Sequence, residues 1–385
     1  MSHNFVRLNI ILIYISPILA ALLLSLVPTL SFALALKDIF LMLLLVFLIK
    51  RYNLATHTVL LLALPFIIVF LASVLNSDIP NVLIFASFRQ LITPYLFVLV
   101  GTLLINNETK LSDIVSLLLK LSLFACFFGF FERFTYLWGN GVLTNYFNAK
   151  NIDLLSSGYP FFFIEPLSYQ ELEEHTGIVR MTSFILDPIN FGHLMVGAFF
   201  LAKKQWYKGV FLFCLLASLS KGALIHFFIV GVVFNKRIHI YVRLILSLCS
   251  FITLLILFGN HAGFLLHLKG LINALQNLSF FGEGIGHAGN YAIILGADNI
   301  YDITDSYLGA VLGQVGAVGF IFWSLPLFYL SMKLWQTHSI GKVILGQLIV
   351  AALSENTFNF SSLIFIFIIA GSFLYEKNCN NRTNR

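Results

Sequence analysis

The sequence predicts an all-α polytopic membrane protein that forms a single integral membrane domain over residues 1–385. Hydrophobic residues make up 59% of the chain, charged residues only 10%, and the mean hydropathy is +0.92. Soluble domains carry about a quarter charged residues. Apolar runs also follow one another along the whole chain, and a run of about 20 residues can cross a bilayer as a helix. We therefore expect about twelve spans.

The apolar runs are separated by short polar or charged stretches, and helices satisfy their own backbone polar groups in lipid. The predicted spans cover residues 8–27, 31–49, 58–76, 82–105, 112–134, 183–202, 209–220, 222–235, 243–259, 306–331, 343–354 and 357–375. Several are shorter than about 20 residues, so the region 209–235 is predicted either as one hairpin or as two full spans.

Two long polar segments, 137–179 and 260–304, interrupt this pattern. Lysine and arginine concentrate on the cytoplasmic side of membrane proteins. If both termini are cytoplasmic, fifteen of the 23 basic residues lie in cytoplasmic segments, against three of the 17 acidic ones (Glu108, Asp113 and Glu376). Both long polar segments then lie outside, in the periplasm or beyond the cell.

The charge distribution excludes several classes of function. The net charge of +6 comes from topology-setting residues beside the spans, so it does not indicate nucleic-acid binding. The cytoplasmic loops are too short for a nucleotide-binding domain, and the sequence has no P-loop. No HExxH motif, CxxC pair or cluster of histidines and cysteines suggests a metal or a disulfide framework. We expect no cofactor and no metal.

A charged cluster begins the predicted span at 183–202. Arg180 is followed within a few helical turns by Asp187, Asn190 and His193. Asp187 and Pro188 are typical of a helix start, which would leave outward-facing N–H groups that suit an anion. An arginine beside such a helix start favours a phosphate or diphosphate. The alternative for Arg180 is a side chain that merely reaches the membrane interface.

Two further basic residues stand at or within apolar runs. Arg89 lies inside the predicted span 82–105, where a charge costs about 2.5–3.5 kcal/mol on insertion scales. It is expected either to form a structural ion pair or to line a cavity. Lys221 lies in a tight outer turn, as a turn residue or as part of a basic rim with Arg180.

The second long polar segment contains a glycine-rich stretch with a histidine. Gly284 and Gly286 flank a position where the backbone can approach a ligand closely, next to Glu283. His287 is a candidate base or phosphate partner, although loop histidines are often only solvated. Asp305 ends the segment and is expected to cap the following helix, whether or not it also takes part in chemistry.

At these residues the chain resembles the O-antigen polymerase and O-antigen ligase superfamily of bacterial polysaccharide assembly. The resemblance covers roughly residues 175–330 and rests on four stretches in the same order. They are Arg180 followed by Ser183-Phe184 and Asp187-Pro188-Ile-Asn190; Ala217-Ser218-Leu-Ser220-Lys221-Gly222-Ala223; Gly282-Glu-Gly284-Ile-Gly286; and Asp305-Ser306-Tyr307-Leu308 with Leu312-Gly-Gln314-Val-Gly316-Ala-Val-Gly319.

Two positions depart from the family pattern. Lys221 stands where the family usually has arginine. Ser306, Gly316 and Gly319 keep the ligase spacing, but Asp305 stands where the ligases carry a histidine. The second departure favours a polymerase over a ligase.

The resemblance implies a glycosyltransferase of GT-C-like architecture that works without metal on the periplasmic face of the bacterial inner membrane. The donor would be a glycan on undecaprenyl diphosphate, and the acceptor a lipid-linked repeat unit of an O-antigen, capsule or other exopolysaccharide. Arg180, with Lys221 or Arg89, would stabilise the diphosphate leaving group. Asn190, His193, Gly284 and Gly286 would complete the binding site. The base is sought first in His287 and Asp305, then in Asp187 and Glu283.

Partners and rivals follow from the same comparison. The family often works with a chain-length regulator protein, besides the lipid bilayer and the lipid-linked glycans. A ligase that moves a finished glycan to another acceptor is the near alternative. A lipid-linked oligosaccharide flippase is the alternative of another class, because transporters also carry polar residues at membrane depth. Internal repeats, which many transporters show, are not evident here.

Overall fold

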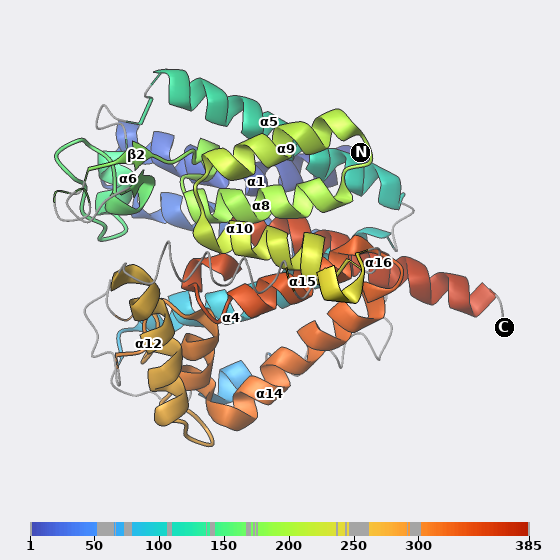
Figure 1. Cartoon of the computed structure of the whole chain (residues 1–385). Helices are drawn as coiled ribbons and strands as arrows, with labels where there is room; N and C mark the ends of the chain where they lie inside the picture. Colours follow the sequence, from blue (N-terminus) through green and yellow to red (C-terminus); the bar gives the residue numbers. More distant parts are fainter. Residues whose placement is uncertain are drawn as a thin grey trace. The chain divides into compact units, whose positions relative to one another are not determined.

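The computed structural model describes residues 2–51, 65, 67–72, 79–105, 110–135, 137–138, 143–166, 171, 174, 176–235, 238–242, 245, 262–290, 292 and 302–383 (Figure 1). The chain is predominantly helical. Within the described residues, five helices are long and apolar enough to cross a membrane: Asn4–Leu26, Phe32–Ile49, Asn81–Ile105, Leu111–Thr135 and Tyr307–Trp335. This agrees with the predicted class of helical membrane protein. The spans predicted at 58–76 and 243–259 lie largely outside the described residues.

The chain divides into two compact units. The first comprises Met1–Leu54, Leu96–Ser220 and Ser361–Arg385, and the second Ala55–Tyr95 and Lys221–Phe360. The helices and strands of the first unit are α1 (Ser2–Leu26), η1 (Ser31–Ala35), α2 (Leu36–Arg51), α5 (Leu111–Thr135), α6 (Thr144–Asn148), η2 (Phe161–Phe163), β1 (Ile164–Glu165), β2 (Ile178–Val179), η3 (Ser183–Ile185), α8 (Pro188–Leu201) and α9 (Gln205–Ala217).

Those of the second unit are α10 (Lys221–Phe228), the π-helical turn η4 (Ile229–Val233), α12 (Ala262–Gln276), α14 (Tyr307–Trp335), α15 (Ser339–Val350) and η6 (Glu355–Phe358). Two of the four boundaries between the units fall within helices that the structure describes. In α4 (Asn81–Ile105) the boundary lies after Tyr95, the residue that follows Pro94. In α16 (Phe360–Thr383) it lies after the first residue, Phe360.

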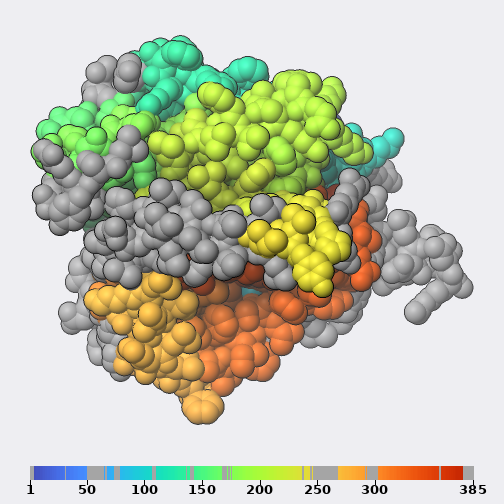
Figure 2. Space-filling view, in the orientation of Figure 1, coloured from blue at the N-terminus to red at the C-terminus, as the bar shows by residue number. Residues whose placement is uncertain are grey.

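Helix α8 lies at the centre of the first unit. It packs on α9 and α5, and nearly every residue from Pro188 to Ala198 is buried. A helix that is apolar on all sides is expected in the interior of a bundle. By contrast, α9 leaves Trp206, Phe213 and Leu216 each about half exposed. The region around α8 and α9 forms the yellow-green surface in Figure 2. An exposed apolar helix face of this kind suits contact with lipid.

Helix α16 makes a close backbone contact with the end of α4. A Cβ atom on Gly101 would lie 2.0 Å from the carbonyl oxygen of Ile368, and one on Gly371 would lie 2.1 Å from that of Val98. The hydroxyl of Ser372 donates to the carbonyl oxygen of Gly101 at 3.1 Å. Small residues at such crossings let membrane helices approach closely.

The described part of the first long polar segment is folded rather than an open loop. Strands β1 and β2 pair antiparallel, with Ile164 opposite Val179 and Glu165 opposite Ile178. Beneath them an aromatic cluster is buried with the end of α1. Its aromatic members are Trp138, Tyr146, Phe147, Tyr159 and Phe163. Burial of several aromatic side chains is a large favourable contribution, so the residues around this cluster hold a defined shape.

Helix α14 of the second unit is broken at Gly316. The residue adopts φ 68° and ψ −176°, a conformation that is essentially restricted to glycine. The glycine-rich stretch fills the break: Glu283 N–H donates to the Gly313 carbonyl at 2.9 Å, and Ala317 N–H donates to the Ser279 carbonyl at 2.9 Å. Backbone groups that the break removes from the helix ladder are thereby satisfied, as a membrane helix requires.

Candidate functional site

Arg180 is held by the first unit at the point where β2 leads into α8. Its side chain is 10% exposed; Nε donates to the Ser218 carbonyl at 3.1 Å, and an Nη donates to the Phe162 carbonyl at 3.3 Å. The same Nη lies 3.7 Å from a carboxylate oxygen of Glu165. Burial lowers the pKa of Arg180, while Glu165 and Asp187 raise it. An arginine remains charged even so, and the structure therefore contains a buried guanidinium.

The C-terminal end of α5 clamps the backbone on both sides of Arg180. The buried carboxylate of Glu132 accepts from Ser183 N–H at 2.7 Å and from the Thr182 hydroxyl at 3.2 Å. Next to it, the guanidinium of Arg133 donates to the Val179 carbonyl. Arg133 is charged, and hydrogen bonds to charged groups are about twice as strong as neutral ones. Residues 179–183 are consequently fixed at both ends.

Asp187 is the N-cap of α8, as the sequence predicts. Its carboxylate accepts from Ile189 N–H at 2.8 Å, from Asn190 N–H at 3.1 Å and from the Asn190 amide at 2.6 Å. Pro188 has no N–H. The donors at this helix start are thus occupied by Asp187, and the prediction of free N–H groups for an anion is wrong. Asn190 and His193 are buried within the first unit, and the Asn190 amide oxygen accepts from Ser362 at 3.2 Å.

The glycine-rich stretch and the start of α14 form a second polar arrangement, in the second unit. Gly284 N–H donates to the Gln314 carbonyl at 3.0 Å. The Gln314 side chain accepts from Gly286 N–H at 3.2 Å and donates to the Ala288 carbonyl at 3.0 Å. Gln314 therefore holds the backbone immediately before and after His287, which is partly exposed.

Asp305 is tied to the same stretch through Asn290. The Asn290 amide donates to the Asp305 carboxylate at 3.2 Å, and Asp305 N–H donates to the Asn290 amide oxygen at 3.1 Å. The predicted capping role is wrong, because Ser306 is the N-cap of α14 and accepts from Gly309 N–H at 3.0 Å. The structure thus brings the segments carrying His287 and Asp305 together, with the Asp305 carboxylate bound by a neutral amide.

Three other predicted residues also lie in the second unit. Arg89 is partly buried within α4, Lys221 begins α10, and Glu283 follows Gly282, whose φ is 78°. The predicted site residues therefore form two groups. Arg180, Asp187, Asn190 and His193 belong to the first unit, and the second contains Arg89, Lys221, Glu283, Gly284, Gly286, His287 and Asp305.

Glu132 and Glu165 are polar residues that the sequence does not single out for the site. An acid next to an arginine at the end of a long apolar run, as in Glu132-Arg133, is a usable signal. Glu165 gives no such signal, because its pairing with Arg180 depends on the pairing of β1 with β2. No group of three or more His, Cys, Asp or Glu side chains among the described residues could hold a metal ion.

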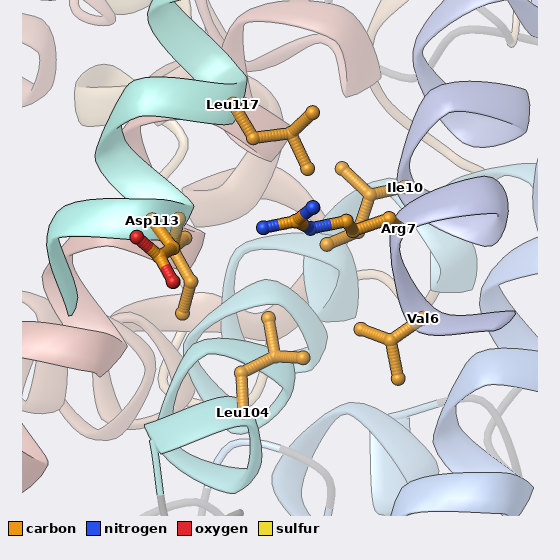
Figure 3. Close-up of a pocket in the computed structure, with 7 residues that line it drawn as sticks. Val6, Arg7, Ile10, Leu104, Asp113 and Leu117 are labelled. Carbon is orange, nitrogen blue, oxygen red and sulfur yellow. The ribbon is translucent and has the colours of Figure 1, made fainter. Parts of the chain in front are cut away.

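A small pocket lies between α1 and α5. Arg7 points towards Asp113 across it, with Leu117 and Ile10 beside them (Figure 3). Its volume of about 10 Å³ holds at most about one water molecule. This pocket is too small for a sugar or a phosphate.

The four stretches that carry the family resemblance meet in pairs. In the first unit Met181 N–H donates to the Ala217 carbonyl at 3.0 Å, beside the bond from Arg180 to Ser218. In the second unit the 282–286 stretch is bonded to residues 313–314. Comparisons of the chain with protein-family models, curated proteins and solved structures find no match.

Proposed function

We propose that this protein is a polysaccharide polymerase that joins undecaprenyl-diphosphate-linked repeat units. The observation that supports it is the pairing in space of the four sequence stretches. The Arg180 stretch bonds to the Ala217-Ser218 stretch, and the glycine-rich stretch bonds to α14 around Gly316. The two stretches of the first pair are 36 residues apart in sequence, and those of the second pair are about 30 residues apart. Residues that served only to set the orientation of the spans in the membrane would not need to meet in this way.

The proposal includes the finer topology that the sequence predicts. About twelve spans cross the bacterial inner membrane, both termini are cytoplasmic, and the long polar segments lie in the periplasm. The periplasmic position suits the chemistry, because a lipid diphosphate is itself an activated leaving group and needs no nucleotide. The product is an O-antigen, a capsule or another exopolysaccharide.

In the proposed reaction an acceptor hydroxyl attacks the anomeric carbon of the donor sugar. The bond from that carbon to the diphosphate oxygen breaks, and the hydroxyl proton passes to a base. The Arg180 guanidinium would stabilise the charge on the departing diphosphate. Its 3.7 Å separation from Glu165 is long for an ion pair, so a phosphate oxygen can compete for the same Nη. His287 and Asp305 are the first candidates for the base.

The test is the surface glycan pattern of cells that lack the gene, run on a gel beside wild-type cells and cells with the gene restored. We expect the ladder of long chains to disappear, leaving single repeat units on the lipid core or on the carrier. Long glycan that stays on its carrier would instead indicate a ligase. Repeat units trapped in the cytoplasmic leaflet would indicate a flippase.

A further inference from the structure

A cleft opens on the folded polar segment of the first unit, beside the strands that position Arg180. Its volume is about 380 Å³, within the range of small-molecule binding sites. Ser156 and Ser157 lie on one side, and Glu174 and Thr176 line it from the chain that leads into β2. All four of these side chains are exposed at the surface of the segment.

The lining of this cleft combines hydroxyl groups with apolar walls. The hydroxyl groups of Ser156, Ser157 and Thr176 can each donate and accept a hydrogen bond. Leu155, Ile164, Val179 and the ring of Tyr159 supply apolar surface beside them. A pyranose ring has the complementary character, with hydroxyls around its edge and C–H groups on its faces. A fatty chain would leave the hydroxyls of the cleft unsatisfied.

The two-stranded ribbon separates this cleft from the charged site. Ile164 and Val179 are paired across β1 and β2, so their side chains share one face of the ribbon. That face lines the cleft. Successive side chains of a strand point to opposite faces, which places Glu165 on the other face, where it pairs with Arg180. One short ribbon thus has an uncharged face and an ion-pair face.

Charge decides which part of a lipid-linked glycan fits the cleft. Glu174 contributes a carboxylate, and none of the described lining residues is lysine, arginine or histidine. A diphosphate would meet the like charge of Glu174 there, with no counter-charge among the described lining residues. The geometry points to a binding subsite for an uncharged hexopyranose, which excludes uronic and other acidic sugars. That the sugar belongs to a lipid-linked repeat unit rests on the proposed function.

The subsite is tested by saturation-transfer NMR on the full chain in a detergent without a sugar headgroup. The probes are the methyl glycosides of glucose, galactose, N-acetylglucosamine and glucuronic acid. We expect transfer to at least one neutral glycoside and binding of the glucuronide weaker by about tenfold or more. In Glu174→Gln the difference between the neutral and the acidic probes should shrink, because the like charge is gone.

A pair of tryptophan variants supplies the matched control. Ser157→Trp fills the cleft from an exposed position and should abolish transfer to every glycoside. Asn148→Trp places the same side chain at an exposed position of α6 outside the cleft and should leave transfer unchanged. The absence of transfer to all neutral glycosides, unchanged transfer in Ser157→Trp, or equal binding of the glucuronide would overturn the subsite.

These outcomes separate the subsite from the polymerase proposal. Sugar binding that Ser157→Trp removes, in a protein whose loss leaves the cellular glycan ladder intact, would keep the subsite and reject the polymerase. Loss of the ladder without any sugar binding in the cleft would keep the polymerase proposal and reject the subsite.

Discussion

Replacing Arg180 by alanine is expected to abolish polymer and to lower the free energy of unfolding by about 3–5 kcal/mol. The guanidinium bonds two carbonyl groups, of Ser218 and Phe162, and pairs with Glu165, whose side chain is only 12% exposed. Its removal leaves a largely buried carboxylate without its neighbouring positive charge. The measurements are the glycan ladder of cells carrying the variant and its thermal unfolding in detergent.

The double variant R180A/E165Q separates the structural role from the catalytic one. Removal of both charges should recover much of the lost stability, since a neutral side chain costs far less free energy to bury than a charged one. It should not recover the ladder. A stable double variant that makes wild-type polymer would show that Arg180 serves the fold alone and would remove it from the proposed mechanism.

Replacing Gly316 by alanine is expected to destabilise the protein by about 3 kcal/mol or more. The glycine-restricted backbone conformation costs other residues about 1–3 kcal/mol, and overpacking adds about as much. The added Cβ would lie 2.2 Å from the Gly282 nitrogen and 2.5 Å from the Phe281 carbonyl carbon. Both are backbone atoms, so the glycine-rich stretch must move away from α14. Its amides should then exchange hydrogen faster, which mass spectrometry can measure.

Gly209→Ala is the matched control for this substitution. Gly209 lies within α9, and no heavy atom is within 4 Å of an added Cβ. Alanine is favoured over glycine in a helix interior by roughly 0.5–1 kcal/mol, so this variant should be as stable as the wild type or slightly more so. If Gly316→Ala behaves like Gly209→Ala in both unfolding and exchange, the glycine-rich stretch is not docked in the break of α14.

Local signals in the sequence predict the helix starts and the membrane class. The Asp187-Pro188 pair predicts the N-cap of α8, and the structure confirms it. The same reasoning predicts the wrong cap for α14 by one residue. Asp305 is the predicted cap, but Ser306 caps the helix and Asp305 bonds to Asn290. Aspartate and serine are both good helix caps. Ser306 takes this role because the side chain of Asn290, distant in sequence, binds Asp305.

Features that depend on distant contacts are not predictable from local pattern. Residues 306–331 form one apolar run, so the sequence predicts an uninterrupted helix. The break at Gly316 exists because residues 279–284 supply the hydrogen bonds that the helix gives up there. Similarly, the sequence shows 137–179 only as a long polar segment, and the fold of its described part depends on aromatic side chains meeting the end of α1. The clustering of Arg180 with Glu165 and Ser218 depends on such tertiary contacts as well.

The most direct test of the polymerase proposal is polymerisation by the purified chain. The substrate is the carrier-linked repeat unit that accumulates in cells lacking the gene, supplied to the protein in liposomes with a chelator present. The proposal predicts a ladder of products that grow by one repeat unit at a time, and no ladder with R180A/E165Q. Transfer of single units to a different lipid acceptor, or movement across the bilayer without any new glycosidic bond, would contradict it.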